Sequence, residues 1–161
     1  MDYRKEYEKW LASPALSEDE RAELRALEGN DKEIKARFYG PLEFGTAGLR
    51  GTMYTGLHNM NRHVIRWATQ GFANVIRAEG EEAMQKGVAV CMDCRNHSAE
   101  FARETACVMA ANGIHVRLFE SLRPTPELSF AVREYGCQAG VNVTASHNPK
   151  AVSYTHLTLP T

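Results

Sequence analysis

The run GVAVCM at residues 87–92 decides the fold of this chain, because it is short, continuously apolar and followed at once by a helical pattern. Such a run is typical of a strand that is covered on both faces. Ser98 is expected to cap a helix that extends through Asn112, with Gly113 as its stop. The run HVRLF at residues 115–119 then predicts the next strand.

The same alternation continues on both sides of this unit. Thr125 and Pro126 predict the start of a helix through Tyr135, and AGVNVT at residues 139–144 predicts the last strand. An amphipathic helix is expected after Asn61, with Val64, Ile65, Ala68, Phe72, Val75 and Ile76 on one face. Strands and helices that alternate at these spacings predict an α/β fold with right-handed crossovers. We therefore expect a three-layer α/β/α domain with a largely parallel sheet.

The first forty residues predict a helical extension without evident chemistry. Tyr3, Tyr7 and Trp10 recur at helical spacing, and Ser17 with Glu20 fits a capping box. A further helical piece is expected over residues 32–38, before a turn at Gly40-Pro41. The expected organisation is an N-terminal helical extension over residues 1–41, a domain over residues 42–150 and a tail over residues 151–161.

Composition excludes several classes of protein. The chain of 161 residues is 43% hydrophobic and 24% charged, with a net charge of −1, which is typical of one soluble domain. It has no basic stripe for nucleic acid, no apolar run for a membrane and no apolar signal core in its charged N-terminus. The four cysteines are expected to be free thiols in a reducing cytoplasm. The CxxC spacing of Cys91 and Cys94 is interpreted as structural, since nothing completes a metal site.

Two polar segments follow predicted strands, at residues 93–98 and 145–149. In parallel sheets, ligands bind beyond the carboxyl ends of the strands. Asn148-Pro149 favours a turn, so the second segment is expected to be a loop that exposes Ser146 and His147. A serine needs a base, a metal or oriented donors to act as a nucleophile. Taken alone, such a pair is more often polar loop surface than a functional site.

A glycine-rich run, FGTAGLRG at residues 44–51, is the third candidate feature. Glycine at every third position is ill suited to a helix or a central strand. Its backbone N–H groups can approach a phosphate closely, and the guanidinium of Arg50 can bind phosphate oxygens. The alternative is a glycine-rich turn with a surface arginine. Arg95 and Asp93 also have two interpretations, and for Asp93 a salt-bridged strand end is favoured.

These segments together resemble a known family. GTAGLRG at residues 45–51 and TASHNP at residues 144–149 are similar to signature segments of the phosphoglucomutase/phosphomannomutase family, the α-D-phosphohexomutases. DCR at residues 93–95 and RPTP at residues 123–126 resemble further parts of that family's first domain. The helical extension looks most like the longer branch, which includes phosphoglucomutases and phosphopentomutases.

The resemblance implies a phosphoglucomutase-type isomerase that interconverts hexose 1-phosphate and 6-phosphate through a phosphoserine and a bisphosphate intermediate. Ser146 would carry the phosphoryl group, and its phosphate would bind Mg²⁺. Arg50 would hold that phosphate and His147 would assist proton transfer. Glucose 1,6-bisphosphate would be the activator and a small sugar phosphate the partner. Pentose phosphate or mannose phosphate substrates, or a non-catalytic phosphate-binding module, remain alternatives, and the oligomeric state is open.

Three further residues receive roles from the resemblance. Thr144 and Asn148 would shape the loop by hydrogen bonding within the phosphate site, and Arg95 would contribute to binding phosphate or substrate. All three flank the strand ends that carry the other candidates.

The chain also departs from the family pattern. Such enzymes have four domains, and this chain resembles only the first, so the aspartate-rich magnesium loop and the sugar-selecting loop have no counterpart. The fragment is therefore expected to be inactive alone. After Lys150 the family pattern leads to a run like Glu-Tyr-Asn-Gly-Tyr-Lys, whereas no lysine, arginine, aspartate or glutamate follows Lys150 here. We interpret residues 151–161 as foreign to the family, a hypothesis that an uninterrupted native reading frame in the parent gene would overturn.

Overall fold

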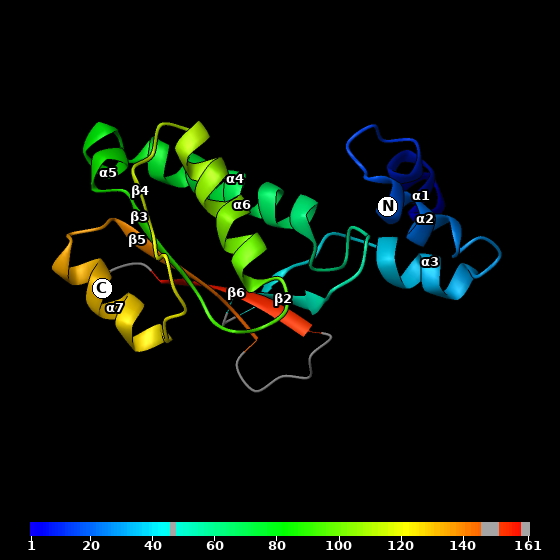
Figure 1. Cartoon of the computed structure of the whole chain (residues 1–161). Coiled ribbons are helices and arrows are strands. Elements are labelled where there is room, and N and C mark those ends of the chain that lie inside the picture. The colour runs from blue at the N-terminus through cyan, green and yellow to red at the C-terminus, as the bar shows by residue number, and fades with distance from the viewer. Residues whose placement is uncertain (46–47, 146–151, 159–161) are drawn as a thin grey trace.

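The computed structural model of the chain describes residues 1–45 and 48–145, and the backbone of residues 152–158. The N-terminal extension consists of three short helices, α1 (Tyr3–Leu11), α2 (Glu18–Arg25) and α3 (Asp31–Phe38). They lie together at one end of the molecule, beside the sheet and its helices (Figure 1). The predicted capping box of α2 is confirmed, because the Ser17 hydroxyl and the Glu20 carboxylate each accept from the other residue's backbone N–H.

The extension has its own small apolar core. Phe38 is fully buried at its centre, with the rings of Tyr7 and Trp10 edge-on at 5.6 and 5.7 Å between centroids. Leu24 is fully buried in the same core. The helical spacing of these aromatic and aliphatic side chains therefore marked a real packing face, as predicted.

The sheet has six strands in the order β1-β2-β6-β5-β3-β4. Its strands are β1 (Phe44–Gly45), β2 (Gly48–Thr52), β3 (Val88–Met92), β4 (Val116–Leu118), β5 (Ala139–Thr144) and β6 (Val152–Thr158). β3 pairs in parallel with both β4 and β5, as predicted from the alternating strands and helices. The pairs β1–β2, β2–β6 and β5–β6 are antiparallel, so the parallel part is one half of a mixed sheet.

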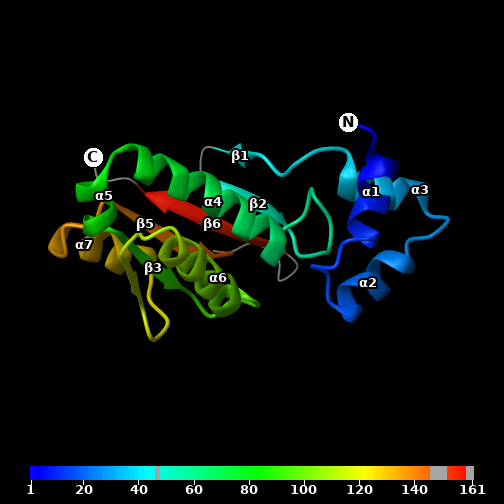
Figure 2. The same ribbon diagram turned by 90° about the horizontal axis from the view of Figure 1, so that it is seen from above.

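Four helices belong to this domain: α4 (Arg62–Ala78), α5 (Glu81–Lys86), α6 (Ser98–Ala111) and α7 (Thr125–Glu134). Figure 1 and the view from above in Figure 2 show α4 and α6 over one face of the sheet, and Figure 1 shows α7 on the other. Val88, Val90 and Val141 pack under α4 and α6, whereas Ala89 and Cys91 face α7. Both faces of the central strands are therefore covered, and the predicted α/β/α layering is confirmed.

The glycine-rich run forms strands, which its composition did not predict. Leu49 is buried in the main core and anchors β2 under α4. A side chain at Gly51 would come within 3.2 Å of the backbone nitrogen of Met60, and Gly48 has φ +106°. Close backbone approach favours glycine at position 51, and a left-handed conformation favours it at position 48. Both are compatible with strand pairing.

Helix starts and one core position also differ from expectation. α6 begins at Ser98, and the residue before it, His97, has a left-handed backbone with φ +61°. Ser98 does not cap the helix, because its hydroxyl donates to the Asp93 carboxylate instead. Thr125 is the first residue of α7 and not its cap. Val75, expected in the core, is exposed.

The proposed boundaries at residues 41 and 150 stay predictions, as does the foreign origin of the tail. β6 lies in that tail and pairs with β2 and β5 along its length. Among the described residues, no helix combines the length and the apolar character that crossing a membrane requires.

Candidate functional site

The candidate site lies at the edge where the parallel strands end. The backbone N–H of Asp93, which directly follows β3, donates to the carbonyl of Val143 in β5 at 3.2 Å. The carbonyl of Met92 accepts from the backbone N–H of Arg123, in the segment after β4, at 3.0 Å. The ends of β3 and β5 are thus joined, and the segment after β4 is tied to the end of β3, at the edge where α/β sheets bind ligands.

Asp93 is the polar centre of this edge. One oxygen of its carboxylate accepts from the backbone N–H of Arg95 and from the hydroxyl of Ser98, each at 3.0 Å. The other oxygen accepts from the hydroxyl of Thr144 at the end of β5. Ser98 and Thr144 are both buried. The carboxylate therefore connects the turn after β3 with the last residue of β5.

Arg50 lies on the same face of the sheet as Thr144. Both residues are register partners of Tyr154 in β6, Arg50 from β2 and Thr144 from β5. Residues opposite each other on neighbouring strands project to the same face, and neighbouring strands lie about 4.8 Å apart. The two backbones are therefore separated by about 10 Å, and the side chain of Arg50 is exposed.

The structure places some of the predicted site residues and leaves others undescribed. Thr144 meets Asp93 directly, Arg95 follows in the same turn and is half-buried, and Arg50 is in line with Thr144 across β6. Ser146, His147 and Asn148 lie outside the described residues. The described chain before them ends with Ala145, which is fully buried.

A buried polar contact near this edge was not foreseen. The Asn142 side chain, only 1% exposed, donates to the Thr125 hydroxyl at 2.5 Å and accepts from the Cys91 thiol at 3.2 Å. It ties β5 to β3 and to the start of α7. The sequence signal was an amide inside an apolar strand, since a buried amide requires partners.

Cys91 has a structural role, as interpreted from the sequence. Burial, together with the negative charges of Asp93 and Glu127, raises the pKa of its thiol to about 12. A thiol with so high a pKa stays protonated and unreactive near neutral pH. Cys91 and Cys94 are both free, with Cys94 exposed.

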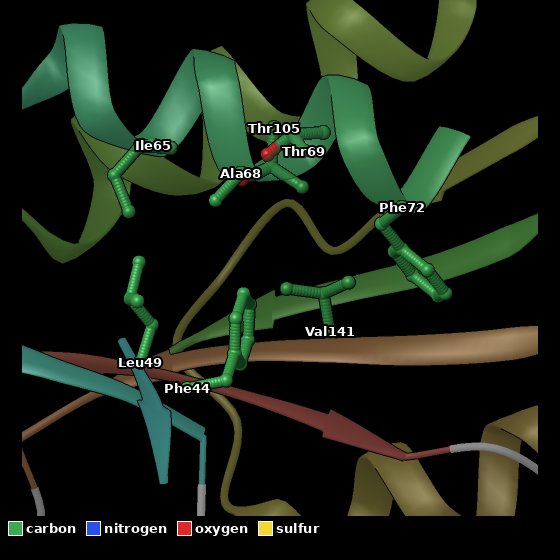
Figure 3. Close-up of a pocket in the computed structure, with 8 residues that line it drawn as sticks. All are labelled: Phe44, Leu49, Ile65, Ala68, Thr69, Phe72, Thr105 and Val141. Carbon is green, nitrogen blue, oxygen red and sulfur yellow. The ribbon is translucent and has the colours of Figure 1, made fainter. Parts of the chain in front are cut away.

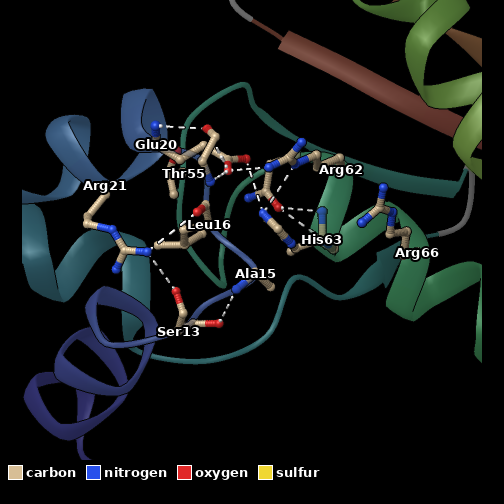
Figure 4. A network of polar contacts seen from close by, with 12 residues as sticks. Ser13, Ala15, Leu16, Glu20, Arg21, Thr55, Arg62, His63 and Arg66 are labelled. Atoms are coloured by element: carbon tan, nitrogen blue, oxygen red, sulfur yellow. Dashed lines mark hydrogen bonds and ion pairs between the residues drawn. The ribbon is translucent and has the colours of Figure 1, made fainter.

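A second polar cluster joins the extension to α4 (Figure 4). Glu20 lies 2.6 Å from a guanidinium nitrogen of Arg62 and 3.1 Å from Nε2 of His63. Burial opposes ionisation of Glu20, but hydrogen bonds from Ser17 and Arg62 outweigh it and lower the pKa of the carboxyl. Burial lowers the pKa of His63, against the attraction of Glu20. This cluster holds the two parts of the chain together.

The described residues do not form a magnesium site. No group of three or more histidine, cysteine, aspartate or glutamate side chains among them is arranged to hold a metal ion. At the strand ends, Asp93 already accepts hydrogen bonds on both carboxylate oxygens. Arg50, exposed on the sheet face that Thr144 shares, provides a cation that suits an anionic ligand.

Comparison with known proteins agrees with this geometry. Residues 41–157 match the family model described as phosphoglucomutase/phosphomannomutase, alpha/beta/alpha domain I. The chain is 40% identical over 129 residues to the phosphopentomutase of Homo sapiens, covering 76% of this chain and 21% of that protein. It is 40% identical over 120 residues to the phosphoglucomutase of Staphylococcus saprophyticus, covering 74% and 21%.

A solved structure is similar as well. The crystal structure of a protein assigned as a phosphomannomutase, from Thermus thermophilus, aligns with a TM-score of 0.67 and 30% sequence identity, covering 74% of this chain and 26% of that one. The chain therefore belongs to the phosphoglucomutase/phosphomannomutase family, the α-D-phosphohexomutases. Within that family it corresponds to domain I, and it spans about a fifth of the length of the curated relatives named above.

Proposed function

We propose that the chain is the phosphoserine-bearing domain of a cytoplasmic phosphosugar mutase of the phosphoglucomutase type. Such an enzyme interconverts hexose 1-phosphate and hexose 6-phosphate through a bisphosphate intermediate. The observation that carries the proposal is the strand-end framework. Thr144, two residues before Ser146, is fixed to Asp93, and the Arg50 cation lies on the same sheet face.

The proposed chemistry is phosphoryl transfer from Ser146. The P–O bond of the phosphoserine breaks as a sugar hydroxyl oxygen bonds to phosphorus. The hydroxyl proton passes to His147 and from there to the departing Ser146 oxygen, which leaves as a neutral hydroxyl. The bisphosphate then reorients, and the transfer of its other phosphate back to the Ser146 oxygen completes the isomerisation. Catalysis of such a loose transition state depends mainly on positioning and charge stabilisation, which is the role proposed for Arg50.

The remaining site residues have supporting roles in the proposal. Arg95 contributes to phosphate or substrate binding from the turn after β3, and Asn148 shapes the loop beyond Ser146. Thr144 supports the loop rather than binding phosphate with its hydroxyl proton, because that proton is donated to Asp93. Each assignment predicts a loss of phosphorylation when the side chain is removed.

Mg²⁺ and glucose 1,6-bisphosphate belong to the proposal as cofactor and activator. The described residues do not form a metal site, so the phosphate on Ser146 would be the ligand that this chain provides. The other ligands would come from the four-fifths of the relatives' length that the chain does not span. We accordingly propose that the chain alone turns over little or no sugar phosphate.

Two other functions fit parts of the observations. A phosphopentomutase or phosphomannomutase specificity is the first alternative. The relatives do not separate the substrates, since a phosphopentomutase and a phosphoglucomutase are each 40% identical to the chain. A phosphate-binding module without catalysis would use the same strand-end framework, but Ser146 would never carry phosphate.

Phosphate mapping tests the proposal. The chain is incubated with glucose 1,6-bisphosphate and magnesium chloride, and phosphorylated residues are located by mass spectrometry. We expect phosphate on Ser146, its loss in Ser146→Ala and its retention in the control Ser129→Ala, which alters an exposed hydrogen bond on α7. Phosphate that persists in Ser146→Ala refutes the carrier role. Robust conversion of glucose 1-phosphate to glucose 6-phosphate by the chain alone would refute the proposed need for further domains.

A further inference from the structure

The carboxylate of Asp93 connects the two halves of the site. Asp93 was interpreted as a salt-bridged strand end, yet its described contacts are hydrogen bonds on both carboxylate oxygens. One oxygen serves the turn that carries Arg95 and Ser98, and the other serves Thr144. Hydrogen bonds to an ionised group are about twice as strong as neutral ones.

The position of Thr144 makes this contact relevant to Ser146. Only Ala145 separates the two, and two residues of extended chain span at most about 7 Å. Thr144 is buried, and Ala145 has no exposed surface. The backbone N–H of Asp93 also donates to Val143 at 3.2 Å. Beyond its pairing with β3 and β6, the end of β5 has two contacts with Asp93: the Val143 carbonyl accepts from the Asp93 backbone N–H, and the Thr144 hydroxyl donates to the Asp93 carboxylate.

We propose that Asp93 is a positioning residue for phosphoryl transfer: its carboxylate, through the Thr144 hydroxyl, fixes the end of β5 two residues before Ser146. This inference rests on the function proposed above. Asp93 does not touch the reacting atoms in this account, and it acts through Thr144. A displacement of about 1 Å in a reacting group costs on the order of 100-fold in rate, so a loosened β5 end is expected to slow transfer more than it weakens donor binding.

The test measures the rate of Ser146 phosphorylation against the concentration of glucose 1,6-bisphosphate in the 161-residue chain. Asp93→Asn weakens the carboxylate acceptor, Thr144→Val removes the donor, and Thr144→Ser keeps the hydroxyl. We expect each of the first two to lower the maximal rate by about 10- to 100-fold, with half-saturation changed less than about threefold. Thr144→Ser should retain most of the rate. Glu100→Gln, which removes the same charge from an exposed ion pair nearby, should match the parent chain.

The double variant Asp93→Asn/Thr144→Val separates a shared contact from two independent effects. If the two side chains act through one hydrogen bond, the double variant is no slower than the slower single variant. Rate losses that multiply, or an Asp93→Asn chain that transfers at the parent rate, overturn the proposal. A loss confined to half-saturation overturns it as well.

Hydrogen exchange keeps this test distinct from that of the proposed function. If the parent chain takes no phosphate on Ser146, the proposed function fails, and Asp93 then has no transfer to position. If the parent is phosphorylated, the amides of residues 139–145 should exchange faster in Asp93→Asn and Thr144→Val, and at the parent rate in Thr144→Ser. Unchanged exchange in Asp93→Asn, even with slower transfer, contradicts positioning through β5.

Discussion

Replacing Thr105 by valine should stabilise the chain. Thr105 lies on α6, is 1% exposed, and its hydroxyl is buried without a hydrogen-bond partner in the described structure. Figure 3 shows it above the sheet beside a narrow cavity. The cavity is lined by Phe44, Leu49, Ile65, Ala68, Thr69, Phe72, Thr105 and Val141. Apart from Thr69 the other lining side chains are apolar, and the Thr105 hydroxyl has no hydrogen-bond partner there.

The expected gain in the free energy of unfolding follows from exchanging the Thr105 hydroxyl for a methyl group. A buried hydroxyl without a partner costs about 1–3 kcal/mol, and valine replaces it with a methyl group of similar size. Threonine and valine have similar helix propensities, so the helix itself contributes little. We expect Thr105→Val to raise the free energy of unfolding by about 1–2 kcal/mol, which is about 2–8 °C in Tm for a chain of this size.

Urea denaturation followed by circular dichroism provides the measurement. The midpoint should rise in Thr105→Val while the m value stays constant, because the surface exposed on unfolding is unchanged. Thr105→Ser is the matched control: it keeps the hydroxyl and loses the methyl group, so it should lower stability by about 0.8 kcal/mol. A Thr105→Val chain that is less stable than the parent would show that the hydroxyl has a partner, and the reasoning would be wrong.

Three further perturbations test other parts of the structure. Gly87→Ala should destabilise the folded chain by more than about 3 kcal/mol, because a Cβ there would lie 2.1 Å from the carbonyl oxygen of His115. Gly29→Ala, also at positive φ but in open space, is the milder control. Equal losses of stability for the two variants in urea titrations would contradict the clash. Phe38→Ala should lower the free energy of unfolding by about 3–5 kcal/mol, as measured from the urea midpoint. A loss under about 1 kcal/mol would mean that the extension is loosely packed. Burial lowers the pKa of His63, so below about pH 6.5 the unfolded state binds the proton more readily. Stability should therefore fall as pH decreases from about 7.5 to 5.5, less steeply in His63→Asn, and an identical slope in both would exclude His63 as the cause.

The sequence predicted most of the α/β framework because periodicity is a local property. Residues close together in the sequence produce the alternation of strand and helix patterns around β3, α6 and β5, and they also form the capping box of Ser17 and Glu20. The strand formed by Gly48–Thr52 could not be predicted from the local sequence. Its Gly51 is packed closely against Leu42 and Met60, and such contacts depend on the fold.

The site was predicted less completely for the same reason. The Asp93–Thr144 bond joins residues 51 positions apart, and no local pattern reports which side chain a carboxylate will meet across a sheet. Arg95, close to Asp93 in the sequence, suggested an ion pair, whereas the fold directs Asp93 toward a hydroxyl on the next strand. Motif resemblance pointed to Ser146, and the structure adds the contact between Asp93 and Thr144, two residues before that serine.

The packing of Trp10 gives the molecule an internal optical probe. Its indole touches Phe38 in the extension and lies 5.8 Å from the ring of His63 on α4, so it reports the junction between the two parts. The other tryptophan, Trp67, is 58% exposed. In a Trp67→Phe chain, emission would come from Trp10 alone. A red shift at low urea, before the loss of helical signal, would then reveal the extension leaving the domain as a separate event.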